Sequence, residues 1–273
     1  MSEIKLKEMY SKEDILEKLK AADRILVGLG EEFDKTKVIG NSSEYQNGKN
    51  LLKSKGCDWL IPAWDAFCLR KMEDKSISSA LGKLSVLLEG KNAFIVSTSV
   101  NGDIARYGGN VVMPCGSGLK KQCFKGCGNV LLEVTEADRK IMGQGFEKLF
   151  HESEVSQEEI GELFSLGTCP ECGAPLVLNT VYAENYNEGG YLEQWKIYTK
   201  WLQGTLNHQL LVLELGVGMK FPSVIRWPFE KAAFFNQKAF FCRVNETLYQ
   251  LAEELSGKGC GISMNTIDWL NQL

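Results

Sequence analysis

The chain contains short runs of apolar residues, each about four to eight long, that end in glycine or in polar side chains. Runs of this kind predict strands that are buried on both faces of a sheet. Apolar residues at helical spacing lie between the runs, so that strands and helices alternate. This alternation is typical of an α/β fold with a parallel sheet covered on both faces. The strands are expected at residues 24–30, 92–97, 110–113, 209–216, 239–245 and 261–264.

Capping residues and glycines mark where the helices begin and end. Ser11 and Ser156 are each followed three residues later by an acidic residue, which is the signature of a capped helix start. Gly90 stops the helical run before it. Residues 34–57 are polar and carry little signal for a helix or a strand. Helices are expected from Ser11, after Pro62, and at residues 76–89, 137–150, 156–165, 191–206 and 246–256.

Composition excludes several classes of protein. The chain has 273 residues, of which 44% are hydrophobic, so it can bury a large core and is not a disordered protein. Its net charge of −4 and its lack of a basic block argue against nucleic acid and anionic membranes as partners. No apolar run approaches the roughly 20 residues that span a bilayer, and residues 1–5 contain no signal-peptide core. We therefore expect a cytoplasmic protein with no nucleic-acid or membrane partner.

Four of the nine cysteines form two close pairs in a segment where the helix–strand alternation breaks down. Cys123 and Cys127 have C-x3-C spacing, and Cys169 and Cys172 have C-x2-C spacing. Two close pairs supply the four thiolates of a tetrahedral zinc site, and four protein ligands make such a site structural. Reduced thiols without a metal are the alternative, and they explain two pairs in one segment poorly. The sequence therefore predicts a structural Zn²⁺.

A Gly-x-Gly turn follows the first predicted strand, at Gly28, Leu29 and Gly30. Such a turn lets backbone N–H groups approach a pyrophosphate. Glu31 and Glu32 come directly after it, and carboxylates repel a pyrophosphate. Two other interpretations are open: the glutamates favour the dipole of a first helical turn, or one of them contacts a ribose hydroxyl.

Polar residues also follow other predicted strands, at the edge where open α/β sheets bind their ligands. Asn101 and Asp103 flank a glycine, and they form either a simple turn or a functional polar pair. Asn245 either contacts a ribose or caps the helix expected after it. Cys115 is either a core cysteine or a functional thiol.

Taken together, the order of these motifs resembles the sirtuin family of NAD-consuming deacylases and ADP-ribosyltransferases. The Gly-x-Gly turn, the Asn-x-Asp element, the Cys115-Gly116-Ser117 strand end, the cysteine pairs and a second glycine turn follow one another as in that family. Residues 213–230 are similar to the macrodomain-linked branch, called class M, and are the most specific part of the resemblance. Residues 90–94 and 120–123 are also similar to that branch.

The resemblance implies a Rossmann-like, doubly wound parallel sheet with a helical insert and an inserted zinc-binding module. The NAD-binding domain would comprise residues 1–34, 86–117 and 200–273, the helical insert residues 35–85, and the zinc-binding small domain residues 118–190. The implied NAD-binding residues are Gly28, Leu29, Gly30, Glu31, Asn101, Asp103, Gly216, Val217, Gly218 and Asn245. The implied catalytic residues are Asn101, Asp103 and Cys115.

The class M resemblance favours an NAD-dependent protein ADP-ribosyltransferase. Such an enzyme cleaves the bond between nicotinamide and ribose and transfers ADP-ribose to an acceptor protein, here a lipoyl-carrier-like one. A protein deacylase is the second interpretation, but Cys115 stands where ordinary sirtuins have a histidine as general base. A degenerate module that binds NAD or ADP-ribose without catalysis is the third. The interpretation leans toward an enzyme.

Overall fold

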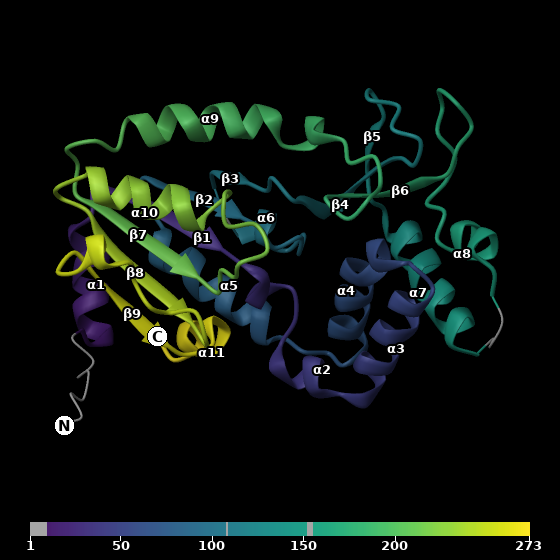
Figure 1. Ribbon diagram of the computed structural model, residues 1–273, viewed down its shortest axis with the longest axis horizontal. Helices are drawn as coiled ribbons and strands as arrows, with labels where there is room; N and C mark the ends of the chain where they lie inside the picture. Colours follow the sequence, from purple (N-terminus) through teal and green to yellow (C-terminus); the bar gives the residue numbers. More distant parts are fainter. Residues whose placement is uncertain (1–9, 108, 152–154) are drawn as a thin grey trace.

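The computed structural model describes residues 10–107, 109–151 and 155–273, and its centre is a six-stranded sheet (Figure 1). The strands are β1 (Arg24–Leu29), β2 (Ala93–Ser97), β3 (Val111–Val112), β7 (Leu210–Leu215), β8 (Phe240–Asn245) and β9 (Gly259–Ser263). Their order is β3-β2-β1-β7-β8-β9, and all neighbouring pairs are parallel. Every one of these strands was expected from an apolar run, and the α/β class is confirmed.

Helices cover both faces of this sheet, so the sheet is doubly wound (Figure 1). Successive side chains of a strand point to opposite faces, and along β1 Ile25 and Val27 therefore enter one core while Leu26 enters the other. The covering helices are α1 (Lys12–Ala21), α5 (Ser76–Leu88) and α11 (Thr266–Asn271) on one face, and α9 (Leu192–Gln203) and α10 (Arg226–Phe235) on the other. No helix within the described ranges has both the length and the apolar character that crossing a membrane requires.

A second, smaller sheet lies beyond the carboxyl ends of the parallel strands (Figure 1). It is antiparallel and consists of β4 (Gly116–Cys123), β5 (Leu131–Glu133) and β6 (Leu176–Thr180), in the order β5-β4-β6. The sequence pattern did not predict these strands. Two helices that it did predict, α7 (Glu136–His151) and α8 (Gln157–Leu163), share their core with this sheet.

Residues 34–57, which carried little signal, are largely helical, and that expectation was wrong. They form α2 (Lys37–Asn41) and α3 (Ser43–Ser54), capped by the hydroxyls of Thr36 and Ser42. The helix predicted after Pro62 is present as α4 (Ile61–Lys71). α3 and α4 pack together, and the Trp64 indole N–H donates to the Tyr45 carbonyl at 3.1 Å. These helices share one core with α7 and α8.

The helix expected at residues 246–256 is absent, so this prediction was wrong. The Asn245 side chain accepts hydrogen bonds from the N–H groups of Thr247 and Leu248 and closes a turn instead. Ala252 is extended, and only the short 3-10 helix η4 (Glu253–Leu255) forms. Asn245 therefore caps a turn and not a helix. The helices α10 and α11 were not predicted.

Candidate functional site

The two cysteine pairs converge at one end of the small sheet. Their four Sγ atoms lie within 4.8 Å of one another, and those of Cys123 and Cys172 are 3.5 Å apart. Sulfurs bound at about 2.3 Å to one tetrahedral zinc lie roughly 3.8 Å apart, so the cluster has the size of a zinc site. Gly126 and Gly173, at φ values of 80° and 73°, turn the backbone beside each pair. The residues present therefore fit a structural Zn²⁺ held by Cys123, Cys127, Cys169 and Cys172.

The two glycine turns lie against each other at the carboxyl ends of β1 and β7. A Cβ atom on Gly30 would lie 2.2 Å from the Gly216 carbonyl oxygen, so only glycine permits this contact. A Cβ atom on Gly28 would lie 2.5 Å from Ile225 Cγ2, which places Gly28 in the packing against α10. Leu29 is likewise buried in the core. Of the first turn, only Gly30 and the residues after it face the second turn.

The side chains of Glu31 and Glu32 fill the space beside the second turn. Glu31 Oε2 accepts a hydrogen bond from the Gly218 N–H at 2.7 Å. Glu32 accepts from the N–H groups of Glu246 and Thr266, at 3.1 and 2.6 Å. Both glutamates thus bind backbone N–H groups from distant parts of the chain. The Glu31 carboxylate binds the Gly218 N–H, which would otherwise be available to an anionic ligand.

An open groove of about 510 Å³ adjoins these glutamates and the second turn. Gly216, Gly218 and Asn245 line it, as do Lys35 and Lys220. The Asn245 amide donates to the Val217 carbonyl at 3.2 Å and so holds the turn in place. Val217 itself is buried. Four residues expected to bind the cofactor, Glu31, Gly216, Gly218 and Asn245, therefore lie together at this groove.

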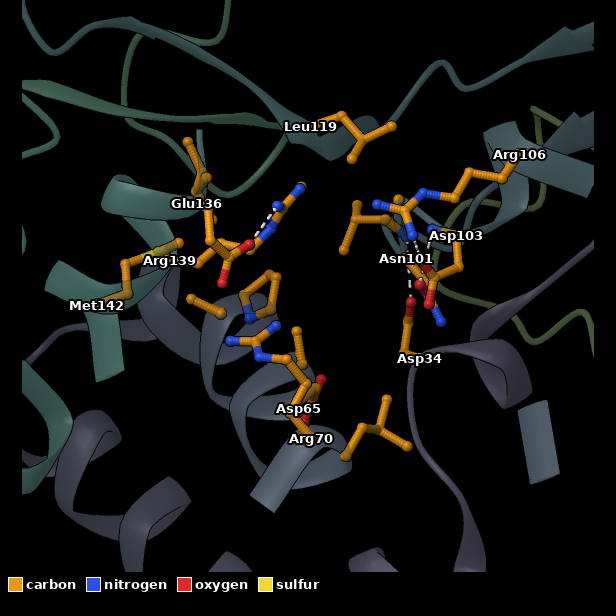
Figure 2. A pocket seen from close by; sticks show the side chains of 18 residues that line it. Asp34, Asp65, Arg70, Asn101, Asp103, Arg106, Leu119, Glu136, Arg139 and Met142 are labelled. Atoms are coloured by element: carbon orange, nitrogen blue, oxygen red, sulfur yellow. Dashed lines mark hydrogen bonds and ion pairs between the residues drawn. The ribbon is translucent and has the colours of Figure 1, made fainter. Parts of the chain in front are cut away.

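A second cavity, of about 370 Å³, lies between the carboxyl edge of the parallel sheet and the helices α4 and α7 (Figure 2). Asn101 and Asp103 line it from the sheet side. The Asn101 amide donates to the Phe33 carbonyl at 2.9 Å, and its oxygen accepts from the Asp103 N–H at 3.0 Å. The pair forms a turn, as the sequence allowed, and that turn presents both side chains at the cavity.

Asp34 is a member of this cavity that the sequence pattern did not single out (Figure 2). It follows the 3-10 helix η1 (Glu31–Phe33), and its Oδ1 accepts from Ser99 Oγ at 2.5 Å and from the Val100 N–H at 3.1 Å. Burial and the nearby Asp65 carboxylate raise the pKa of Asp34 to about 7. The only sequence signal for Asp34 is its position as a polar residue shortly after a parallel strand.

Three arginines border the same cavity from the other elements (Figure 2). Arg106 pairs with Asp103 at 3.3 Å, and Arg139 pairs with Glu136 at 2.9 Å. Among the described residues, no hydrogen bond or ion pair involves the Arg70 guanidinium. Burial and the neighbouring Arg139 lower the pKa of Arg70. The cavity therefore has both carboxylates and guanidinium groups on each of its sides: Asp103 and Arg106 on the sheet side, Glu136 and Arg139 on the helical side.

No protein-family model matches this chain. A structure titled Sir2Tm bound to a propionylated peptide aligns with 96% of this chain and 97% of its own, at a TM-score of 0.52 and 12% identity. A Sir2 homologue in complex with NAD aligns with 96% of this chain and 92% of its own, at a TM-score of 0.52 and 13% identity. The chain has the sirtuin fold.

A relative by sequence is a protein named Protein ADP-ribosyltransferase from Staphylococcus aureus (strain Mu50 / ATCC 700699). It is 23% identical to this chain over 188 residues. The match covers 67% of this chain and 56% of that protein, so the chain spans little more than half of the relative's length.

Within this sirtuin fold, Cys115 lies before β4 and is 2% exposed. Its carbonyl accepts from the Val181 N–H at 2.9 Å, and its side chain is not among those that line the 370 Å³ cavity. Burial raises the pKa of its thiol to about 12, with a further contribution from the Asp34 carboxylate. The thiol is therefore protonated at neutral pH and is a poor base.

Proposed function

We propose that the chain is an NAD-dependent ADP-ribosyltransferase that cleaves the bond between nicotinamide and ribose and transfers ADP-ribose to an acceptor protein. One observation carries the proposal. In a sirtuin fold, the Asn101 and Asp103 side chains line a cavity at the sheet edge, while the place of the expected base is taken by the buried Cys115 thiol. The name of the S. aureus relative supports the same activity.

The two cavities offer room for the two ends of NAD. The η1 segment separates them, because Glu31 and Lys35 line the groove while Asp34 lines the cavity at the sheet edge. Asn101 and Asp103 would hold the nicotinamide and its ribose, and Gly216 and Asn245 would hold the adenosine. Val217, which is buried, would only support the turn between them. The pyrophosphate would bind at this turn only after the Glu31 carboxylate turned away, because that carboxylate binds the Gly218 N–H.

Bound NAD supplies an activated ribose carbon and a neutral leaving group. The chain's own residues orient the ribose, exclude water and stabilise the positive charge that develops on the sugar. Carboxylates suit this last task, and Asp34 and Asp103 both line the cavity. Zn²⁺ would bind Cys123, Cys127, Cys169 and Cys172 and stabilise the small sheet, with no open coordination position for chemistry.

Deacylation is the less favoured alternative. It requires a base that activates a ribose hydroxyl for attack on the acyl group. The Cys115 thiol, with its raised pKa, does not meet this requirement at neutral pH. Transfer of ADP-ribose to an acceptor that is already nucleophilic makes no such demand at this position.

The test is to incubate zinc-loaded protein with NAD and a bacterial lysate, and to measure nicotinamide by chromatography and acceptor masses by mass spectrometry. We expect nicotinamide release together with an added ADP-ribose on a protein, with lipoyl-carrier proteins as the first acceptors to assay. The Cys115→Ala variant should release nicotinamide at a similar rate. Release of acyl-ADP-ribose, lost in that variant, would establish deacylation instead. Binding of ADP-ribose without any release would establish a non-catalytic module.

A further inference from the structure

Asp34 stands where the segments that leave β1 and β2 meet. Its Oδ1 accepts both hydrogen bonds that tie it to the second segment, from Ser99 Oγ and the Val100 N–H. No hydrogen bond from the described residues reaches Oδ2. Because Asp34 lines the 370 Å³ cavity beside Asn101, the second oxygen remains available to a bound molecule (Figure 2).

The groups that face Asp34 come from several elements, and most of them are acidic or become negative when they ionise. Asp65 of α4 is buried, and its Oδ1 accepts from the Tyr45 hydroxyl at 2.7 Å. An ionised carboxylate here is destabilised by its neighbours and by burial, and is stabilised by Ser99 and Val100. The other titratable groups that act on Asp34, or that it acts on, are Glu31 of η1, Tyr45 of α3, Cys115 before β4 and Tyr182 after β6.

We propose that Asp34 is a catalytic residue of this cavity and accepts the proton of the acceptor nucleophile. This proposal rests on the proposed function. In the step, the bond between the ribose C1′ and the pyridinium nitrogen breaks, and its electron pair leaves with neutral nicotinamide. The acceptor's lone pair forms the new bond to C1′, and its proton passes to Asp34 Oδ2 and then to solvent. Charge and atoms balance without any further reactant.

The geometry explains why the base lies here and not at Cys115. A base that works near neutral pH needs a pKa close to 7, and the pKa of Asp34 is about 7 while that of Cys115 is about 12. Asp34 also shares its cavity with Asn101 and Asp103, whereas Cys115 is not part of the lining. Asp34 is thus the carboxyl group of the cavity whose second oxygen accepts no hydrogen bond from the described residues and whose charge changes near neutral pH.

A structural role is the competing explanation, because Asp34 also joins two loops. Asp34→Asn keeps an Oδ1 that can accept from Ser99 and Val100, and it removes only the capacity to take a proton. Two further variants move the titration in opposite directions. Ser99→Ala removes a hydrogen bond that lowers the pKa of Asp34, so the pKa rises; Asp65→Asn removes a charge that raises it, so the pKa falls.

The experiment measures nicotinamide release from NAD between pH 5.5 and 8.5, with ADP-ribose binding by calorimetry in parallel. We expect the wild-type rate to rise with pH through about 7 and Asp34→Asn to lower it by roughly 100-fold or more, with ADP-ribose binding retained. The rise should move to higher pH in Ser99→Ala and to lower pH in Asp65→Asn.

An active Asp34→Asn variant with an unchanged pH profile would overturn the proposal. So would a loss of rate in Ser99→Ala as large as that in Asp34→Asn with no shift of the profile, because that result indicates a loop-joining role. A wild-type protein that neither binds ADP-ribose nor cleaves NAD refutes the proposed function itself, and the assignment of Asp34 with it. Failure of the assignment alone is recognised by cleavage that persists without the carboxylate.

Discussion

Replacing Glu31 with alanine should strengthen the binding of ADP-ribose. Glu31 Oε2 accepts a hydrogen bond from the Gly218 N–H at 2.7 Å, and its other oxygen is buried without a hydrogen-bond partner among the described residues. A Cβ on Gly218 would lie 3.0 Å from Glu31 Oε2, so the carboxylate fills the space next to the turn. A pyrophosphate that uses this turn must therefore displace a carboxylate, and the alanine variant removes that step.

The size of the effect follows from the contact that the ligand has to break. A hydrogen bond to an ionised acceptor contributes about 1.5–3 kcal/mol. Since about 1.4 kcal/mol corresponds to a tenfold change in affinity, the variant should bind ADP-ribose roughly 10- to 100-fold more tightly. We expect the lower end of this range, because the groove is open to solvent and water replaces part of the contact.

Calorimetric titration with ADP-ribose measures this directly, since no turnover interferes. Glu246→Gln is the matched control: it removes a carboxylate close to the groove that pairs with Lys37 and leaves the Gly218 N–H untouched. Its effect should be small and should fade at higher salt. Equal or weaker binding by Glu31→Ala would refute the displacement argument and would favour the other interpretation, in which Glu31 contacts a ribose hydroxyl.

Three further predictions concern stability and the metal. Because the pKa of Asp34 is about 7 in the folded chain against 3.8 ordinarily, the wild type should lose stability as the pH rises from 4 to 7. Asp34→Asn should abolish this loss, a gain of up to about 4 kcal/mol at pH 8 by urea denaturation, and identical pH profiles would contradict it. Glu214→Leu should cost about 3–5 kcal/mol in the same assay, since it breaks a buried ion pair in which both Glu214 oxygens bind the Arg243 guanidinium, which keeps only Glu230 as a carboxylate partner among the described residues; a cost below 1 kcal/mol would argue against this. Cys169→Ser should reduce bound zinc well below one ion per chain by elemental analysis, and undiminished zinc would exclude the four-cysteine site.

The parallel strands could be predicted because burial on both faces demands continuous apolar sequence. β1, β7 and β8 are almost wholly buried and mainly apolar, and the buried charges of β7 and β8, Glu214 and Arg243, pair with each other. The zinc cluster could also be predicted from the sequence, because each ligand pair is local in sequence. The small antiparallel sheet could not be predicted, since only one of its strands, β6, is buried throughout.

The helical errors have a different cause. α3 buries only Tyr45, Gly48 and Leu52. Gly48 packs directly against the Trp64 ring, and a Cβ atom at this position would lie 2.4 Å from that ring. A glycine used for close packing weakens the periodic signal on which prediction depends. The opposite error arose after β8, where apolar residues have helical spacing but the Asn245 side chain binds the next N–H groups in a turn.

The site shows the same division between local and distant contacts. Asn101 and Asp103 belong to one turn, so their proximity was predictable. The partner of Glu31 is Gly218, and Asp34 gains its environment from Ser99 and Asp65, each far away in the sequence. No periodicity or spacing encodes such contacts. The backbone partners of Glu31 and Glu32 can be identified only in the fold, which brings the two glycine turns together.

The carboxylates after β1 would oppose the binding of a pyrophosphate in the groove, and Glu31 and Asp34 have different consequences because they lie in different places. Glu31 holds the N–H that a pyrophosphate needs, and Asp34, three residues later, lines the cavity where the chemistry would occur. Both belong to the short segment around η1, and the Glu31 charge contributes to the raised pKa of Asp34. A ligand that displaces Glu31 therefore also changes the electrostatic surroundings of Asp34. Binding at the groove and proton transfer at the cavity are coupled through this one segment, so the Glu31→Ala variant should shift the pH profile of nicotinamide release as well as the affinity for ADP-ribose.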